Sequence, residues 1–189
     1  MFNVKALIAG LVFGALAATS AQAAPAVGTI DFGVSGSEGA FTYDDATKTI
    51  TFSVGTFTVD NATGDFVALI GDAGTMTNPI DLDGVLPISP LWTVSGFEFE
   101  ATQIFDIDYN VSSIAGFVSE TLSFKALGYL DDTGGSYDTS FGIWEYTGQR
   151  TGGSAGTWSG SGAFRAPEPG ILALVGVGLL GLGLARRRA

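Results

Sequence analysis

Aspartates close to glycines offer oxygen ligands for a divalent cation. The stretch DIDYN, which starts at Asp106, begins like the D-x-D-x-N of an EF-hand loop. It departs from that loop at Val111, where glycine is needed, and at Phe117, where the bidentate glutamate is needed. Aspartate and glycine also combine in three other segments: DNATGD (60–65), DLDG (81–84) and DDTGG (131–135). Since turns require the same residues, calcium binding and plain turn formation are two alternatives for these segments.

Two glutamates in the stretch FEFEAT form a possible acid–base pair. Glu98 and Glu100 are two residues apart, so on a strand they point to the same side, with carboxyl groups roughly 6 to 7 Å apart. This is close to the separation found in inverting glycosidases. The pair therefore indicates either a glycoside-active enzyme or two ordinary solvent-facing residues.

The large aromatic residues allow a carbohydrate-binding interpretation. The rings that could stack on sugars belong to Trp92, Trp144, Trp158, Tyr109 and Tyr146. In a β-sheet protein such residues also fill the core. The sequence thus leaves a carbohydrate- or calcium-binding module as an alternative function.

The absence of certain residue types narrows the chemistry. The chain contains no cysteine and no histidine, which excludes cysteine nucleophiles, Ser-His-Asp triads and the usual ligands of zinc and copper. Residues 24–165 hold four basic and 18 acidic residues, a balance that repels phosphate backbones. We therefore expect a non-enzymatic protein with no cofactor, apart from the calcium alternative, and no nucleic-acid partner.

Alternating side chains predict the elements that position these residues. FDIDYNVS and FEFEAT each place apolar residues on one side and polar residues on the other, which is typical of antiparallel strands with one solvated face. FTYDDATKTITFSV predicts a hairpin that turns at DDATK. The fold is predicted to be mainly β and antiparallel β-sandwich-like, with a jelly-roll or barrel-like arrangement as the alternative.

Other stretches predict less regular structure. Residues 71–90 are rich in proline, glycine and aspartate and predict a long loop. Residues 111–122 have apolar spacing compatible with a helix, although a turn followed by the strand ETLSFKALGYL is the preferred interpretation. Residues 24–37 and 148–169 are rich in small residues and are expected to be linkers.

The N-terminal stretch has the three parts of a secretory signal. Lys5 precedes an apolar run over residues 6–18, and the small residues end in Ala21-Gln22-Ala23. We predict a helical signal peptide over residues 1–23 with cleavage between Ala23 and Ala24. Sec-type export machinery and signal peptidase are the expected partners, and residues 24–165 form the exported β-rich domain.

The C-terminal stretch predicts a single membrane span. Residues 170–185 carry no charge, and three arginines follow at once: Arg186, Arg187 and Arg188. Positive charge stays on the cytoplasmic side, so the body and the segment Pro167-Glu168-Pro169 lie outside. A helix of this length is short for a bilayer, which suggests a temporary anchor.

The stretch PEPGILALVGVGLLGLGLARRR closely resembles the PEP-CTERM sorting tail of exported bacterial proteins, from Ala166 to the end of the chain. The resemblance implies a substrate of exosortase, a membrane processing enzyme, in a protein that reaches the cell surface or is secreted after processing. It implies an association with exopolysaccharide and the biofilm matrix. It also implies roles for two sets of residues: Pro167, Glu168 and Pro169 as the recognition motif, and Arg186, Arg187 and Arg188 as the retention signal.

Overall fold

The structure is a computed structural model that describes residues 23–36, 38–152 and 155–166. The predicted C-terminal membrane helix lies outside these residues, and so does the predicted signal helix except for Ala23. Within the described ranges, no helix has the length and apolar character needed to cross a membrane.

The described residues form eleven strands and one short 3-10 helix, η1 (Gly64–Leu69). Eight strands close into a barrel, in the order β1 (Gly28–Gly36), β11 (Ala155–Arg165), β10 (Ser140–Thr151), β9 (Phe117–Asp132), β8 (Phe97–Ile114), β7 (Ile88–Val94), β5 (Ala73–Met76) and β4 (Thr56–Ala62). The other three form a small sheet, in the order β2 (Phe41–Asp44), β3 (Thr49–Phe52) and β6 (Ile80–Asp81). Neighbouring strands pair antiparallel throughout both sheets.

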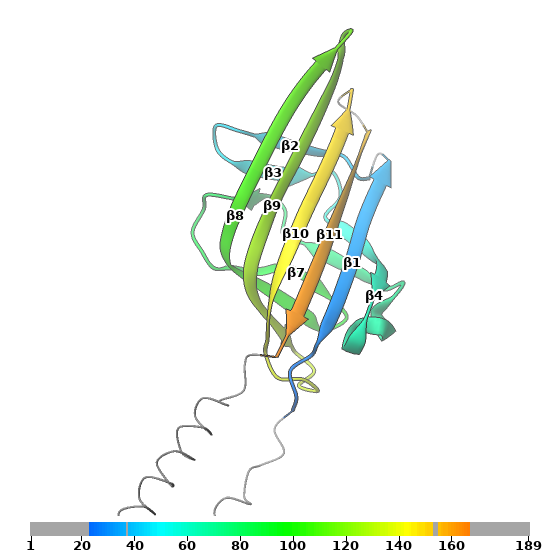
Figure 1. Ribbon diagram of the computed structural model, residues 1–189, viewed down its shortest axis with the longest axis vertical. Helices are drawn as coiled ribbons and strands as arrows, with labels where there is room; N and C mark the ends of the chain where they lie inside the picture. The colour runs from blue at the N-terminus through cyan, green and yellow to red at the C-terminus, as the bar shows by residue number, and fades with distance from the viewer. Residues whose placement is uncertain (1–22, 37, 153–154, 167–189) are drawn as a thin grey trace, which may run out of the picture.

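The strands lie in two layers. Figure 1 shows the long strands β8, β9, β10, β11 and β1 side by side in front, with β2, β3 and β7 behind them and β4 beside β1. The prediction of a mainly antiparallel β fold is confirmed. The layers are sandwich-like, while the strand order is that of the barrel alternative.

Aromatic side chains fill the space between the layers. Trp144 and Tyr146 of β10 are fully buried, and the Tyr146 ring stacks on Phe124 with centroids 4.9 Å apart. Phe32 stacks on Phe57 at 3.9 Å. The small sheet covers the inner face of the long strands, because Phe41 and Phe52 pack against Tyr146. Burial raises the pKa of the Tyr146 hydroxyl.

The prediction of linkers at residues 24–37 and 148–169 is wrong, because both stretches contain barrel strands, β1 and β11. The glycines that suggested flexibility make room for rings. A Cβ atom at Gly160 would lie 2.5 Å from Nε1 of Trp144, and one at Gly162 would lie 2.7 Å from the Phe164 ring. Small residues are therefore needed in β11 so that the aromatic core can pack against its backbone.

The prediction of a long loop at residues 71–90 is also wrong in part, because these residues include the strands β5 and β6 and the start of β7. Pro90 lies within β7, where the pairing register with β8 shifts between Ile88 and Trp92, a position at which a strand tolerates proline. At residues 111–122 the preferred turn-and-strand interpretation is confirmed. The strand β9 begins at Phe117, earlier than expected.

The two ends of the barrel differ. At the Arg165 end, β1 starts beside the last residues of β11, with Gly28 opposite Phe164. At the hairpin end, the β8–β9 hairpin extends past the rest of the barrel (Figure 1). Its side chains are exposed there, Ile114 at 76% and Phe117 at 72%.

Candidate functional site

The aspartate-rich segments use their carboxylates within their own turns. In DDTGG, the Asp132 carboxylate accepts hydrogen bonds from the backbone N–H groups of Gly134 at 2.8 Å, Ser136 at 2.7 Å and Tyr137 at 3.1 Å. In DLDG, Asp81 accepts from the N–H of Asp83 at 3.1 Å. These contacts correspond to the turn alternative.

Two other segments direct a carboxylate to a distant part of the chain. In DNATGD, the Asp65 carboxylate accepts the N–H of Val27, 38 positions away, at 2.8 Å. In DIDYN, Asp106 pairs with Lys125 at 3.1 Å. Across the part of the chain that the structure describes, no three acidic side chains gather in a way that could hold a metal ion.

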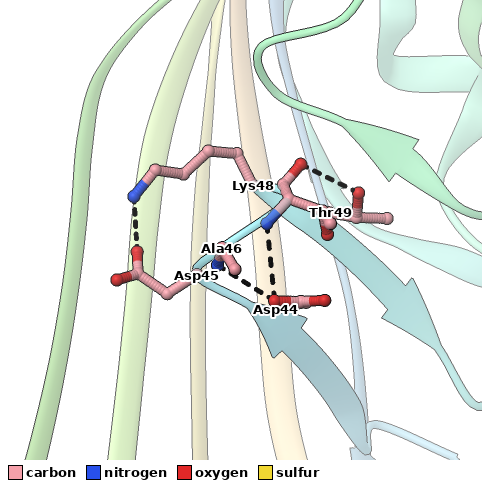
Figure 2. Close-up of polar contacts among 6 residues, drawn as sticks. Asp44, Asp45, Ala46, Lys48 and Thr49 are labelled. Carbon is pink, nitrogen blue, oxygen red and sulfur yellow. Dashed lines mark hydrogen bonds and ion pairs between the residues drawn. The ribbon is translucent and has the colours of Figure 1, made fainter.

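A further turn of this kind joins β2 to β3, at the predicted DDATK turn, which is confirmed. Figure 2 shows Asp44 accepting from the backbone N–H of Ala46, and Lys48 reaching Asp45. Hydrogen bonds from Ala46 and then Thr47 hold the pKa of the Asp44 carboxyl below its ordinary value. The hydrogen bond to Asp45 raises the pKa of the Lys48 ammonium.

Glu98 and Glu100 lie on β8 and point away from the core, as their position on the strand predicts. Glu98 is exposed and opposite Asp131, whereas Glu100 is half-buried and opposite Tyr129. Neither glutamate lines the hollow that contains Thr147 or the hollow that contains Gly33.

The three tryptophans are core residues. Trp92, Trp144 and Trp158 are exposed by 1%, 0% and 2% of their surface, and Tyr146 is buried with them. Among the aromatic residues proposed for sugar stacking, Tyr109 alone is half-buried rather than buried. The core interpretation of these tryptophans is therefore confirmed, and their rings are not available to a sugar on the surface.

A hollow of about 380 Å³ lies on the long strands. We call it the outer groove and define it by its lining residues: Asp108, Thr121, Leu122, Ser123, Thr147, Gly148, Gln149, Thr157, Trp158 and Ser159. They come from β8, β9, β10 and β11. Leu122, Gly148 and Trp158 are buried and form its floor, while the exposed and half-exposed residues are polar.

Strand register arranges the polar residues in two rows across the sheet. One row runs through Asp108, Ser123, Thr147 and Ser159, each opposite the next on the neighbouring strand. The second row runs through Thr121, Gln149 and Thr157. Because side chains alternate along a strand, these two rows point to the same face of the sheet.

The polar side chains in the outer groove differ from those around it in how they are paired. Beside the groove, Lys125 pairs with Asp106 and Glu145, and Asp31 accepts from Ser161 and Asn61. Within the groove, Thr147 and Ser159 share one hydrogen bond of 2.9 Å. In the described residues, no side-chain hydrogen bond or ion pair engages the other five polar residues: Asp108, Thr121, Ser123, Gln149 and Thr157. Their donors and acceptors are thus open to a ligand.

Sequence reasoning did not find this groove. Its residues come from four strands and lie up to 51 positions apart, between Asp108 and Ser159, and Thr157 and Ser159 belong to the stretch that was expected to be a linker. The available signal was the alternation of Thr, Ser and Gln with Gly and Trp in residues 147–159.

The C-terminal segment is similar to a known sorting motif. A family model for the PEP-CTERM protein-sorting motif matches residues 165–188. The chain carries a PEP-CTERM sorting tail. The PEP-CTERM tail implies an exported protein that is anchored in the membrane before exosortase, a membrane enzyme, processes it. No curated protein and no solved structure matches the chain.

The PEP-CTERM match contains all the residues predicted for sorting. Pro167, Glu168 and Pro169 lie near its start, and the three arginines, Arg186, Arg187 and Arg188, lie at its end. All six are outside the described residues, so their individual roles stay predictions. Cleavage between Ala23 and Ala24 also stays a prediction. The structure places Ala24 at the Arg165 end of the barrel, because its carbonyl accepts the N–H of Asp138 at 3.2 Å.

Proposed function

We propose that this chain is a non-enzymatic protein of the cell surface or extracellular matrix, and that its barrel binds exopolysaccharide in the outer groove. The observation that carries the proposal is the set of five polar side chains in the groove that have no partner within the described chain. The PEP-CTERM tail supports a location outside the cell, where such a polymer is met.

The chemistry of the groove suits a polyhydroxylated ligand. Hydroxyl groups of Thr and Ser donate and accept hydrogen bonds, and the Gln149 amide does both at separate atoms. Since neighbouring strands are about 4.8 Å apart, four strands spread these groups over about 14 Å. A sugar chain presents donors and acceptors at regular intervals, so one oligosaccharide segment can contact several strands.

The proposal of no enzymatic activity rests on residue types and placement. The chain lacks histidine and cysteine, and the candidate acid–base pair, Glu98 and Glu100, lies outside the outer groove. A sugar held in the groove would therefore contact neither glutamate.

The test is retention of the purified exported protein on polysaccharide from the producing cells. We expect the triple variant T121A/Q149A/T157A to be retained at least tenfold less than the wild type, because it removes three sets of unpaired donors and acceptors. The matched control is T75A/T93A, which removes two hydroxyl groups on β5 and β7 that bond to each other at 2.9 Å outside the groove. Equal retention of the wild type and the triple variant would reject the groove as the binding site.

A further inference from the structure

The lining of the outer groove carries a negative charge and no positive charge. Asp108 is the one ionisable side chain in its lining, and no lysine or arginine lines it. No ion pair in the described residues neutralises Asp108, whereas the nearby Asp106 has Lys125. A ligand in the groove therefore meets a carboxylate and no cation.

A second hollow continues the outer groove along the same row. This hollow measures about 340 Å³ and is lined by residues that include Gly33, Glu38, Thr58 and Asp60. Gly33 is opposite Ser159 of the groove on one side and Thr58 on the other, so the two hollows adjoin. Its carboxylates, Glu38 and Asp60, are also without a cationic partner among the described ion pairs.

Gly33 keeps the two hollows open to each other. A Cβ atom there would lie 2.9 Å from the Trp158 carbonyl oxygen and 3.5 Å from the Asp60 carboxylate. Any larger residue would fill the space between Ser159 and Asp60. The absence of a side chain at this crossing leaves the backbone uncovered between the two hollows. From β8 to β4 the row follows the curved barrel surface for about 24 Å at the usual strand spacing.

Irregularities of the strands place the two carboxylates beside this path. Between Phe105 and Asp108 the register of β8 with β9 shifts by one residue, and Asp106 has a φ of 53°. A second shift, in the pairing of β1 with β4, leaves Asp60 without an opposite residue. β-bulges turn side chains away from the regular alternation. The carboxylates thus lie near the two ends of one polar row.

From these observations we propose, building on the function proposed above, that the joined hollows select a glycan with free amino groups, such as a hexosamine polymer. Its hydroxyl groups bond to the Ser, Thr and Gln rows, and its ammonium groups lie against Asp108 and Asp60. Anionic polymers such as polyuronates are disfavoured, because residues 24–165 carry 18 acidic residues against four basic ones. An exposed ion pair changes affinity about fivefold at most, so selection depends on two carboxylates contacted by one polymer.

The test compares three hexasaccharides of equal length by calorimetry on the full protein: β-1,4-linked glucosamine, the same chain N-acetylated, and a polyuronate. We expect the glucosamine hexamer to bind at least tenfold more tightly than its N-acetylated form and the polyuronate to bind least. The preference should shrink as salt is raised, because exposed charges are screened.

Substitutions separate local contacts from overall charge. In D108N/D60N the affinity for glucosamine should fall to that for the N-acetylated hexamer. The control D83N/D81N changes net charge equally but on the small sheet and the loop after it, and should keep the tenfold preference. Equal binding of the two hexamers by the wild type, or equal effects of the two double variants, would overturn the amine selection while leaving hydroxyl recognition intact. If the wild type binds no hexamer and the T121A/Q149A/T157A variant still binds the native polysaccharide, the groove proposal fails as well.

Discussion

Arg150 joins the small sheet to the barrel. Its guanidinium donates to the Phe41 carbonyl of β2 at 2.9 Å and to both carboxylate oxygens of Glu120 on β9 at 2.8 Å. Tyr109 donates to the same carboxylate at 2.9 Å. Burial, and then this hydrogen bond, raise the pKa of the Tyr109 hydroxyl. The Arg150 and Glu120 side chains are exposed by 17% and 14%. Both contacts to Glu120 come from one nitrogen, Nη2. Charge-assisted hydrogen bonds at a partly buried site make this pair stronger than an ordinary surface ion pair.

Replacing Arg150 by methionine should lower the free energy of unfolding by on the order of 2 kcal/mol, between the effects of exposed and fully buried pairs. The loss arises because Glu120 keeps its charge with no cationic partner and retains just the hydrogen bond from Tyr109. Urea unfolding followed by tryptophan fluorescence measures it. The control K48M, which breaks the exposed pair with Asp45, should change the midpoint far less. Equal effects of the two substitutions would contradict this role of Arg150.

Asp44 makes the stability of the β2–β3 turn depend on pH. Its pKa in the folded chain lies below the ordinary 3.8, chiefly because the Ala46 N–H bonds to the carboxylate. A group with a lowered pKa stabilises the fold above its unfolded pKa, and this contribution is lost as pH falls through the folded value. The variant D44N has no carboxyl group at this position, so it lacks this pH-dependent contribution to stability.

We therefore expect the wild type to exceed D44N in urea midpoint at pH 7 and to lose that advantage progressively as the pH falls below the ordinary pKa of 3.8. Midpoints measured at several pH values check this. A difference between the two proteins that stays constant from pH 7 to pH 3 would show that the charge of Asp44 does not contribute.

At the scale of the element, β11 shows how a strand can consist mostly of small residues. Gly160 and Gly162 alternate with exposed Ser159, Ser161 and Ala163. The ring of Trp144 on β10 occupies the space beside Gly160, and the ring of Phe164 on β11 itself occupies the space beside Gly162. The variant G160A should lower stability by about 1–3 kcal/mol, because its Cβ overlaps the Trp144 ring.

Thermal unfolding of G160A, with the tryptophan emission of the folded state, tests this packing. The neighbouring substitution S159A is the control, since that side chain points to solvent. The packing argument fails if G160A melts at the same temperature as S159A and has the same emission.

The alternation of apolar and polar residues predicted strands such as β8 and the β2–β3 hairpin, because each of those segments carries its own buried face. β11 could not be predicted in this way, because its buried positions include glycines such as Gly160, whose burial comes from rings on other strands. In β1 the buried Ile30 and Phe32 do alternate with less buried residues, but the small residues around them indicated a linker. The outer groove was missed for a related reason, since Ser123, Thr147 and Ser159 meet only through strand register. The sorting tail was found because its residues are contiguous in the sequence.

At the scale of the whole molecule, the sorting segment begins at one end of the barrel. The PEP-CTERM segment starts at Arg165, at the end of β11, which Figure 1 shows beside the start of β1 and opposite the β8–β9 hairpin. While the tail anchors the protein, the hairpin end is therefore the farther one from the point of attachment.

Replacing Pro167, Glu168 and Pro169 by three alanines should leave export and signal removal intact. The variant should stay in the membrane with its C-terminal tail uncleaved. The reason is that the predicted recognition motif for exosortase is lost while the apolar segment remains. Fractionation of cells, with mass spectrometry of the C-terminal peptide, measures the outcome. The control R150M leaves the tail unchanged and should be trimmed. A triple-alanine variant that is released and trimmed like the wild type would show that these three residues are not the sorting signal.

The pairing of β1 with β11 also sets an order of events during biogenesis. The barrel closes only when its first strand meets its last, and β11 ends at Arg165, where the sorting segment begins. We predict that the signal segment over residues 1–23 leads export. The edge of β1 that pairs with β11 then stays open until almost the whole body has emerged. At that moment the next residues to arrive are those of the tail. Closure of the barrel and arrival of the sorting signal are therefore expected to coincide, and a chain interrupted before β11 would present the unpaired edge of β1 to other chains.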